Sequence, residues 1–259
     1  MFKIHIVYKV NNFYVKVRTH NFTDRHGDVM PASKESILTH LRRQIITLEL
    51  VPGAMLDEAA LCAEFEISRT PMREILRRLD GEGFVRVREN RGVIVAPMDL
   101  GSMRQFFMTA PMIYAAISRL AAQNAQPDQL DRLAEIQRAF KGAVSSASVE
   151  QMVYYNDQFH YQIGEMADNA YLQPSFQRLL IDHARIGQTF WRTDKHISAH
   201  TPDKIDEACR HHDEMIAAFA AGDEELSVQL TLQHWELSRA DIETYIHPDP
   251  LALDSLMTG

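Results

Sequence analysis

Residues 68–78 read Ser-Arg-Thr-Pro-Met-Arg-Glu-Ile-Leu-Arg-Arg, and this stretch decides the fold of the N-terminal part of the chain. Ser68 or Thr70 can cap a helix, and Pro71 is tolerated only within a first helical turn. An apolar stripe follows at helical spacing: Met72, Ile75, Leu76 and Leu79. The opposite side carries Arg69, Arg73 and Arg77. Because a helix of this kind suits the major groove of DNA, we interpret it as a recognition helix.

The flanking sequence completes a small domain around this helix. Apolar periodicity predicts helices over 33–48 and 58–65, the first ended by a Pro-Gly pair, with a tight turn before residue 68. Alternating apolar residues at 84–87 and 93–95 predict two strands joined by the turn 89–92, a small wing. The whole unit spans about 65 residues, which is too short for a larger catalytic fold.

These residues carry a resemblance to a known family. The matching positions are Pro52, Gly53, Leu56, Glu58, Leu61, Ser68, Arg69, Thr70, Pro71, Arg73, Glu74, Leu79, Gly83, Asn90, Arg91, Gly92 and Val95. This pattern resembles the winged helix-turn-helix of GntR-family bacterial transcription regulators. The resemblance implies DNA contacts from Ser68, Arg69, Thr70 and Arg73, and from Arg91 and Gly92 at the wing tip. Arg77 lies on the same side of the helix, and we add it to the expected DNA-binding residues.

Charge divides the chain into regions of different character. Residues 33–97 contain ten Lys/Arg and ten Asp/Glu, so attraction to phosphates must come from local clustering of arginines. The alternative is that these arginines form an ordinary solvated face. Residues 98–259 hold 12 Lys/Arg against 23 Asp/Glu, and so acidic a region does not suit a nucleic-acid backbone. DNA contact is therefore expected from residues 30–97 alone.

Several classes of protein are excluded by the remaining composition. Two cysteines, Cys62 and Cys209, do not indicate a disulfide scaffold. No apolar run approaches the ~20 residues needed to cross a bilayer, so we expect a cytoplasmic protein without membrane contact. Residues 1–29 fit neither domain, although 2–8 alternate like a strand. We expect this extension to be largely disordered, with natural translation starting at Met30, and residues 247–259 to form a tail.

The C-terminal part reads as an all-α antiparallel bundle of about six helices over residues 98–246. Apolar periodicity between Pro, Gly, Ser and Asn breakers gives these expected helices: 100–124, 127–144, 149–168, 171–192, 203–221 and 223–246. Their short connections favour antiparallel neighbours. The fold class is therefore mainly α, with a winged helix-turn-helix followed by a helical bundle.

Histidine spacing indicates a site inside this bundle. Asn156 and His160 lie one helical turn apart on one face. His212 and His234 lie ten residues before Gly222 and eleven after Asp223, so they should meet across an antiparallel hairpin. If the helix of His160 packs against that hairpin, three imidazoles and one side-chain oxygen converge on a divalent ion such as Zn²⁺, Ni²⁺ or Mn²⁺. The alternative for each histidine is a surface or hydrogen-bonded core position.

The same region carries a second resemblance. Asn156, Phe159 and His160, then Asn169 and Leu172, are similar to the FCD ligand-binding domain of many GntR regulators. So is the later set, His212, Met215, Ala218, Gly222, Asp223 and His234. The resemblance implies that three histidines, and an Asp four residues before the first, bind a metal whose coordination a small carboxylate completes. Asn156 occupies that Asp position here, with the neighbouring Asp157 as the second choice.

Two arginines are candidates for binding the effector. Arg185 and Arg192 lie two turns apart on nearly one helix face, and either could form a charge-assisted fork with a carboxylate. The alternative for each is a surface ion pair.

Together these features predict a ligand-responsive transcription regulator, with repression the expected sign. A homodimer would read a pseudo-palindromic operator in double-stranded DNA, and a small organic acid at the metal would change the spacing of the DNA-binding domains. One alternative keeps DNA binding but makes the metal purely structural, with no effector. A histidine-metal hydrolase is a further alternative, although no H-E-x-x-H motif or carboxylate pair accompanies the histidines, and we expect no enzyme activity.

Overall fold

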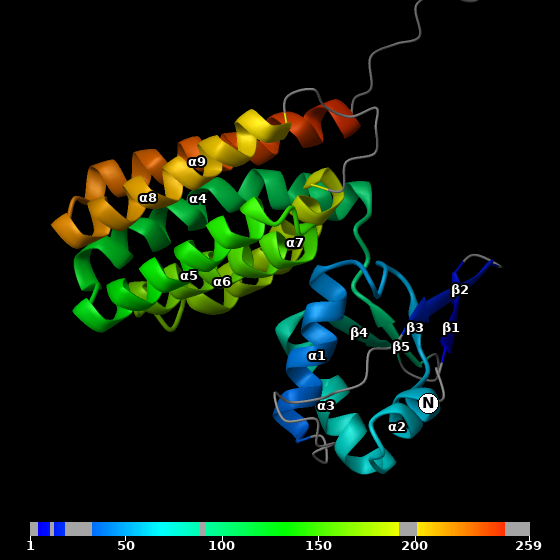
Figure 1. Ribbon diagram of the computed structural model, residues 1–259. Coiled ribbons are helices and arrows are strands. Elements are labelled where there is room, and N and C mark those ends of the chain that lie inside the picture. Colours follow the sequence, from blue (N-terminus) through cyan, green and yellow to red (C-terminus); the bar gives the residue numbers. More distant parts are fainter. Residues whose placement is uncertain (1–4, 11–12, 19–32, 89–91, 192–200, 247–259) are drawn as a thin grey trace, which may run out of the picture.

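The computed structural model describes residues 5–10, 13–18, 33–88, 92–191 and 201–246. A small domain of three short helices and a three-stranded sheet lies beside a bundle of six long helices (Figure 1). This mainly helical architecture confirms the predicted fold class.

Three helices form the first half of the small domain, and a side chain caps the start of the first two. They are α1 (Lys34–Ile46), α2 (Glu58–Glu64) and α3 (Arg69–Glu82). The Ser33 hydroxyl accepts a hydrogen bond from the Ser36 amide at 3.1 Å, and the Asp57 carboxylate accepts one from Ala59 at 2.8 Å. Such caps satisfy amides that have no partner within the helix. Glu66, at φ 54°, provides the sharp turn between α2 and α3.

The wing sheet is antiparallel, in the order β3-β5-β4. Its strands are β3 (Met55–Leu56), β4 (Val85–Arg88) and β5 (Gly92–Val95). Val87 pairs with Val93 and Leu56 also lies opposite Val93, so β5 forms the centre. The helices and this sheet enclose one apolar core that includes Ile37, Leu61 and Met72.

An additional hairpin precedes α1. Strands β1 (His5–Val10) and β2 (Phe13–Arg18) pair antiparallel, with Val10 opposite Phe13. Over residues 5–10 and 13–18 this differs from the disorder expected for the extension, and the rest of 1–29 lies outside the described residues.

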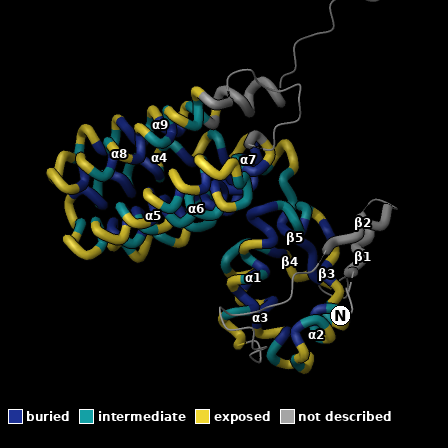
Figure 2. The backbone as a smooth tube through the Cα atoms, viewed as in Figure 1, coloured by how far each residue is buried: buried dark blue, intermediate teal, exposed yellow. Residues whose placement is uncertain are grey.

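The bundle consists of long helices around a second core. They are α4 (Leu100–Asn124), α5 (Pro127–Ser145), α6 (Val149–Ala167), α7 (Gln173–Trp191), α8 (Thr201–Ala221) and α9 (Glu224–Ile246). Buried residues lie on the inward sides of the helices in both domains, and exposed residues lie on the outer sides (Figure 2). Helix α4 contains Pro111 in its interior and packs against α6 and α9. Helices α8 and α9 form a hairpin whose turn contains Gly222. Among the described helices, none is long and apolar enough to cross a membrane.

Several helix boundaries differ from expectation by one or two residues, and at two of them the local backbone and side chains give the reason. Helix α1 ends at Ile46 rather than residue 48, because Leu48 has a left-handed φ of 58°. Helix α7 begins at Gln173 rather than residue 171. There the Asn169 side chain accepts hydrogen bonds from the amides of Tyr171 and Leu172 at 3.1 and 3.0 Å.

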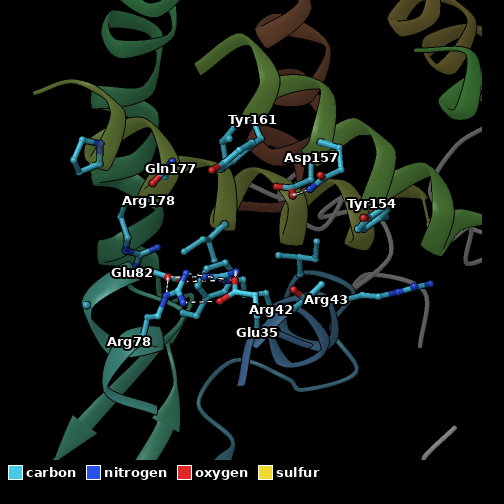
Figure 3. A pocket seen from close by; sticks show the side chains of 18 residues that line it. Glu35, Arg42, Arg43, Arg78, Glu82, Tyr154, Asp157, Tyr161, Gln177 and Arg178 are labelled. Atoms are coloured by element: carbon cyan, nitrogen blue, oxygen red, sulfur yellow. Dashed lines mark hydrogen bonds and ion pairs between the residues drawn. The ribbon is translucent and has the colours of Figure 1, made fainter. Parts of the chain in front are cut away.

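The two domains meet along α1, α6 and α7. Ile46 of α1 packs with Val153 of α6 and Ala184 of α7 in a small apolar cluster. Next to it lies a pocket of about 660 Å³ (Figure 3), with Tyr154, Asp157 and Tyr161 of α6 facing α1 and α3 across it. The helix that carries Asn156 and His160 therefore also forms a wall of the junction with the small domain.

Candidate metal centre and DNA-binding surface

Three histidines from three helices converge inside the bundle. One nitrogen each of His160 (α6), His212 (α8) and His234 (α9) can be chosen so that all lie within 4.8 Å of one another. The rings of His212 and His234 have centroids 4.7 Å apart, as their near-symmetric spacing about the α8–α9 turn predicted. The sequence therefore predicted correctly that these side chains meet.

Each of these histidines has a buried nitrogen with no hydrogen-bond partner among the described residues. The unpaired atoms are Nε2 of His160, Nε2 of His212 and Nδ1 of His234. Asn156, one turn before His160, adds a buried unpaired Oδ1. Leaving a buried polar atom unpaired costs roughly 1–3 kcal/mol. The three converging histidine nitrogens therefore indicate a bound group, and with an oxygen from the neighbouring Asn156 they would suit a divalent metal ion.

Burial keeps these imidazoles neutral, which is the form that binds metals. Desolvation lowers the pKa of His212 to about 3 and places the pKa values of His160 and His234 well below their ordinary value. Repulsion between neighbouring imidazoles lowers them further. At neutral pH each ring therefore has a lone pair available to a cation.

Gln137 of α5 fixes the orientation of one candidate ligand. Its Oε1 lies 2.9 Å from Nδ1 of His212, and its Nε2 donates to the Cys209 carbonyl at 3.0 Å and to Asp213 at 3.1 Å. Because an amide oxygen only accepts, His212 carries its proton on Nδ1 and presents a bare Nε2 to the centre. Outer hydrogen bonds of this kind typically hold metal-ligating histidines in place.

Asn156 rather than Asp157 belongs to this site. Asn156 is 5 % exposed and shares the face of α6 with His160. Asp157 instead lines the pocket at the domain junction, where burial raises its pKa to about 7 and Gln158 is a weak donor at 3.4 Å. The second-choice ligand therefore faces the domain junction.

A fourth buried histidine lies beside the three. His183 of α7 has its ring centroid 4.8 Å from that of His160, and its Nδ1 is 2.8 Å from the Tyr114 hydroxyl. Trp235, next to His234 in the chain, packs against Tyr114 with ring centroids 5.5 Å apart, and within the part of the chain that the structure describes its buried indole N–H has no acceptor.

Of the two arginines expected to bind an effector, the described residues include only Arg185, and it lies elsewhere. Arg185 is fully buried, pairs with Asp182, and donates from Nη1 to the Ala96 carbonyl at 2.6 Å. Its guanidinium therefore holds the segment between the two domains. Arg192 lies outside the described residues.

The residues expected to contact DNA lie on the outer face of α3. Ser68, Arg69, Thr70, Arg73 and Arg77 are all exposed, while the apolar stripe of the same helix is buried. Arg73 pairs with Glu58 of α2 at 3.0 Å, a contact that a phosphate could replace. Gly92 begins β5 at φ 79°, and Arg91 lies outside the described residues.

Sequence reasoning missed Gln137, Tyr114, His183 and Trp235. A signal was present for Gln137, a polar residue between Ile136 and Phe140 in the buried stripe of α5. His183 similarly interrupts the buried face formed by Leu180 and Ala184. Such residues need buried partners, but only the packing of α4, α5 and α7 reveals which partners they have.

Comparison with known sequences gives two matches. Residues 33–95 match the gntR family of bacterial regulatory proteins, and residues 112–237 match the FCD domain. Among curated relatives, the HTH-type transcriptional repressor RspR of Escherichia coli K12 is 26 % identical over 134 residues, covering 52 % of this chain and 59 % of the relative. The Nta operon transcriptional regulator of Aminobacter aminovorans is 26 % identical over 120 residues, or 46 % of this chain and 56 % of the relative. These alignments span less than two thirds of each relative.

Solved structures share the fold over a longer stretch. Escherichia coli McbR/YncC aligns with a TM-score of 0.67 at 20 % identity, covering 83 % of this chain and 97 % of that one. A GntR transcriptional regulator from Rhodococcus sp. RHA1 aligns with a TM-score of 0.61, also at 20 % identity, over 82 % and 97 %. At 20 % identity, this likeness shows a shared fold and nothing beyond it.

Proposed function

Because this chain belongs to the GntR family of transcriptional regulators and carries an FCD domain, we propose that it is a repressor controlled by a small carboxylate bound at a metal. The observation that carries this proposal is the convergence of three buried histidines, His160, His212 and His234, each with a nitrogen that has no hydrogen-bond partner among the described residues. The chain is a regulator and not an enzyme, as are the relatives that it matches.

The DNA-binding half of the proposal rests on the exposed face of α3. Arg69, Arg73 and Arg77 project from a helix whose other face is anchored in the core by Met72 and Leu79. A helix supported in this way can enter the major groove, where arginine contacts guanine through two hydrogen bonds. We infer that a homodimer places two such helices on the half-sites of a pseudo-palindromic operator.

The sensing half rests on the donor set. The three histidines and Asn156 would hold Zn²⁺, Ni²⁺ or Mn²⁺, which would act as a Lewis acid for an anionic oxygen. Protein groups supply four donors, so a carboxylate would complete the coordination. The neutral imidazoles leave the bound ion positively charged in a buried site, which favours an anionic ligand.

Helix α6 provides a physical route from this site to DNA. It carries Asn156 and His160, and Val153, two turns before His160, packs against Ile46 of α1. Glu150 at the start of α6 also pairs with Arg43 of α1, with Oε1 3.0 Å from Nε. A ligand that binds one position of α6 better than another would therefore shift the DNA-binding domain as well.

The test combines metal analysis with ligand binding on the full chain. Wild type is compared with His212→Ala, which removes one donor, and with His211→Ala, which removes a neighbouring histidine outside the cluster. We expect near-stoichiometric zinc in wild type and His211→Ala, and little in His212→Ala. A thermal-shift series with acetate, lactate, succinate and citrate should then stabilise only the zinc-loaded proteins. Metal-free wild type would overturn the metal part of the proposal.

DNA binding is tested separately with arginine variants. Arg77→Ala or Arg69→Ala should weaken binding to the chain's own promoter DNA by roughly 1–3 kcal/mol. Arg138→Ala, an exposed arginine of the bundle, removes the same charge far from α3 and should have no effect. Equal losses in all three variants would indicate bulk charge rather than a recognition helix.

A purely structural metal is the second candidate. It is favoured by the burial of the site, where the three histidines are between 0 and 6 % exposed. In that case removing zinc would lower the melting temperature, but no carboxylate would change promoter binding. The melting temperature without zinc and promoter binding with added carboxylate therefore distinguish a sensor site from a structural site.

A further inference from the structure

The pocket at the junction of the two domains is a second candidate site, separate from the histidine cluster. Helices α6 and α7 form one wall and α1 and α3 form the other, and its volume is about 660 Å³. This size is within the range of pockets that hold small organic molecules. Asp157 lies between Tyr154 and Tyr161 on the α6 wall, opposite the ion-paired side chains of α1 and α3 (Figure 3). None of the three clustered histidines lines the pocket.

The positive charges of this pocket already have partners. Each of its four arginines has a carboxylate oxygen within 3.4 Å, and the pairs are Arg42–Glu82, Arg78–Glu35, Arg43–Glu150 and Arg178–Asp182. Two of the three acidic residues that line the pocket, Glu35 and Glu82, are therefore bound to guanidinium groups. An anion entering the pocket would have to displace one of these carboxylates.

Asp157 is the exception among the acidic residues of the pocket. The described residues give its carboxylate no ion pair, and the hydrogen bond that they do give it comes from the neighbouring Gln158 at 3.4 Å. Hydrogen bonds from N–H to oxygen are typically about 2.9–3.0 Å long, so this contact is weak. The charge that the pocket leaves without a close partner is therefore negative, and it lies at Asp157.

The surface around Asp157 is aromatic. Tyr154 and Tyr161 lie three residues before it and four residues after it on α6, so all three share one side of the helix. Arg43 already lies over the Tyr154 ring, 5.5 Å from its centroid. The Tyr161 side chain is 42 % exposed, and within the described chain no cation lies over its ring. A carboxylate beside an open aromatic ring suits an organic ammonium group.

We propose that the junction pocket binds a small aliphatic amine, whose ammonium group donates to the Asp157 carboxylate and whose methylene groups pack against the Tyr161 ring. The ammonium group supplies the donor that Asp157 lacks. Because the arginines of the pocket are already paired, the site selects a cation over an anion. This site takes a ligand of opposite charge to the acid proposed for the metal centre, and it does not rest on that centre.

An amine in this pocket would also act on DNA binding, because both domains line it. Arg78, Gly81 and Glu82 belong to the last turns of α3, and the first turns of the same helix carry the arginines expected to contact DNA. An amine that binds this spacing of the two walls better than another would stabilise this arrangement of the domains. Promoter DNA and the amine should then change each other's affinity by the same factor.

The experiment follows thermal denaturation of the full chain during titration with butylammonium chloride. Sodium chloride at equal ionic strength controls for screening, and sodium butyrate is the anionic counterpart of similar length. Asp157→Asn removes the charge and keeps the shape, Tyr161→Leu removes the ring, and Tyr161→Phe keeps it. Asp131→Asn is the matched control, since it removes an exposed carboxylate from α5. His212→Ala tests whether the amine binds at the histidine cluster instead, and zinc content is measured for every variant.

We expect butylammonium to raise the melting temperature of wild type in a saturable manner, and sodium butyrate not to displace it. Apparent affinity should fall about tenfold or more in Asp157→Asn and several-fold in Tyr161→Leu. Tyr161→Phe, Asp131→Asn and His212→Ala should match wild type. If Asp157→Asn fails to fold, the comparison of Tyr161→Leu with Tyr161→Phe still decides. Saturating butylammonium should change promoter affinity in wild type and leave it unchanged in Asp157→Asn.

Three results would overturn the assignment of the pocket. They are no stabilisation of wild type beyond that given by sodium chloride, equal amine affinity in wild type and Asp157→Asn, and loss of amine binding in His212→Ala. Unchanged promoter affinity in amine-saturated wild type would remove the link to DNA. Promoter affinity without amine is measured first, so a failure of DNA binding itself is recognised separately. A zinc-loaded protein that binds no carboxylate would end the proposed effector site and leave this inference standing.

Discussion

At the scale of single residues, Asn156 is the unusual member of the site. It offers a neutral amide oxygen where a carboxylate would bring a negative charge to the metal. Its Oδ1 is buried without a partner, so the residue is placed to bind rather than to fill space. A neutral donor set of this kind binds a divalent ion less tightly and leaves more positive charge for the incoming acid.

Restoring the charge gives the first prediction. Asn156→Asp should tighten zinc binding by about tenfold or more, equivalent to ~1.4 kcal/mol, because a carboxylate attracts the ion directly. The same change should weaken acetate binding, since the added charge repels an anion. Competition against a zinc-sensitive dye measures the first effect and calorimetry the second. Asn156→Ala is the control that removes the oxygen, and tighter zinc binding in it would contradict the reasoning.

The buried histidines predict a dependence of stability on pH. Their folded-state pKa values are lowered, to about 4 for His183 and about 3 for His212, so the unfolded chain takes up protons first. Metal-free protein should therefore lose stability as pH falls below the unfolded value of 6.5, by up to ~1.4 kcal/mol per pH unit for each histidine. The loss continues down to the folded values.

Thermal denaturation in chelator between pH 7.5 and 4.5 checks this expectation. Zinc-loaded protein should show a steeper decline, because protons compete with the metal for the same nitrogens. A melting temperature of the metal-free chain that stays constant from pH 7 to pH 5 would show that these imidazoles are not buried in neutral form.

The candidate site was predictable from sequence where residues on one helix or one hairpin determined each other's positions. Asn156 and His160 share a helix face, and His212 and His234 share a hairpin, so spacing alone brought them together. His183 could not be placed in this way. Its pairing with Tyr114 depends on how α7 packs against α4, which no local spacing specifies.

At the scale of elements, α3 is defined by its two ends. Ser68 starts it at an extended backbone position, and Gly83 ends it in the left-handed region at φ 88°. Helix periodicity predicted the buried residues of α3 correctly, because its apolar stripe is regular. The two-residue strand β3 was missed, since Met55 and Leu56 become a strand only through pairing with β5.

Two glycines of this region should respond in opposite directions. Gly83→Ala adds a Cβ at a left-handed position, where it would meet Arg178 Cδ of the bundle at 2.3 Å. We expect a loss of about 1–2 kcal/mol in the free energy of unfolding from the backbone alone. Gly81→Ala lies inside α3 with nothing within 4 Å, and should stabilise by roughly 0.5–1 kcal/mol. Urea denaturation of both variants tests this pair, and effects of the same sign would contradict it.

At the scale of the whole molecule, the junction between domains depends on a buried charge. Arg185 is 0 % exposed, pairs with Asp182 and donates to the Ala96 carbonyl just before the bundle begins. Sequence alone suggested an effector contact for this residue. Its actual neighbours come from packing between segments 89 residues apart, which the pattern of one helix cannot show.

Removing this charge gives the last prediction. Arg185→Met should lower the free energy of unfolding by about 3 kcal/mol, because the buried Asp182 loses its closest partner. Arg178→Met, which removes the more exposed and more distant partner of Asp182 at 3.4 Å, should cost less than ~1 kcal/mol. Zinc content should be unchanged in both. Similar losses of unfolding free energy in Arg185→Met and Arg178→Met would show that the Arg185–Asp182 ion pair is solvated rather than buried.

The contact between Arg185 and Ala96 also bears on how such proteins can be recombined. The arginine binds a main-chain carbonyl, which every amino acid provides, so residue 96 is free to vary as long as the chain follows the same path. A DNA-binding domain of different specificity could therefore be grafted onto this sensor without redesigning that bond. The junction can therefore accept DNA-binding domains of different sequence. Chimeric regulators in which another DNA-binding domain is fused just before Ala96 should keep the hydrogen bond from Arg185 to the main-chain carbonyl of residue 96.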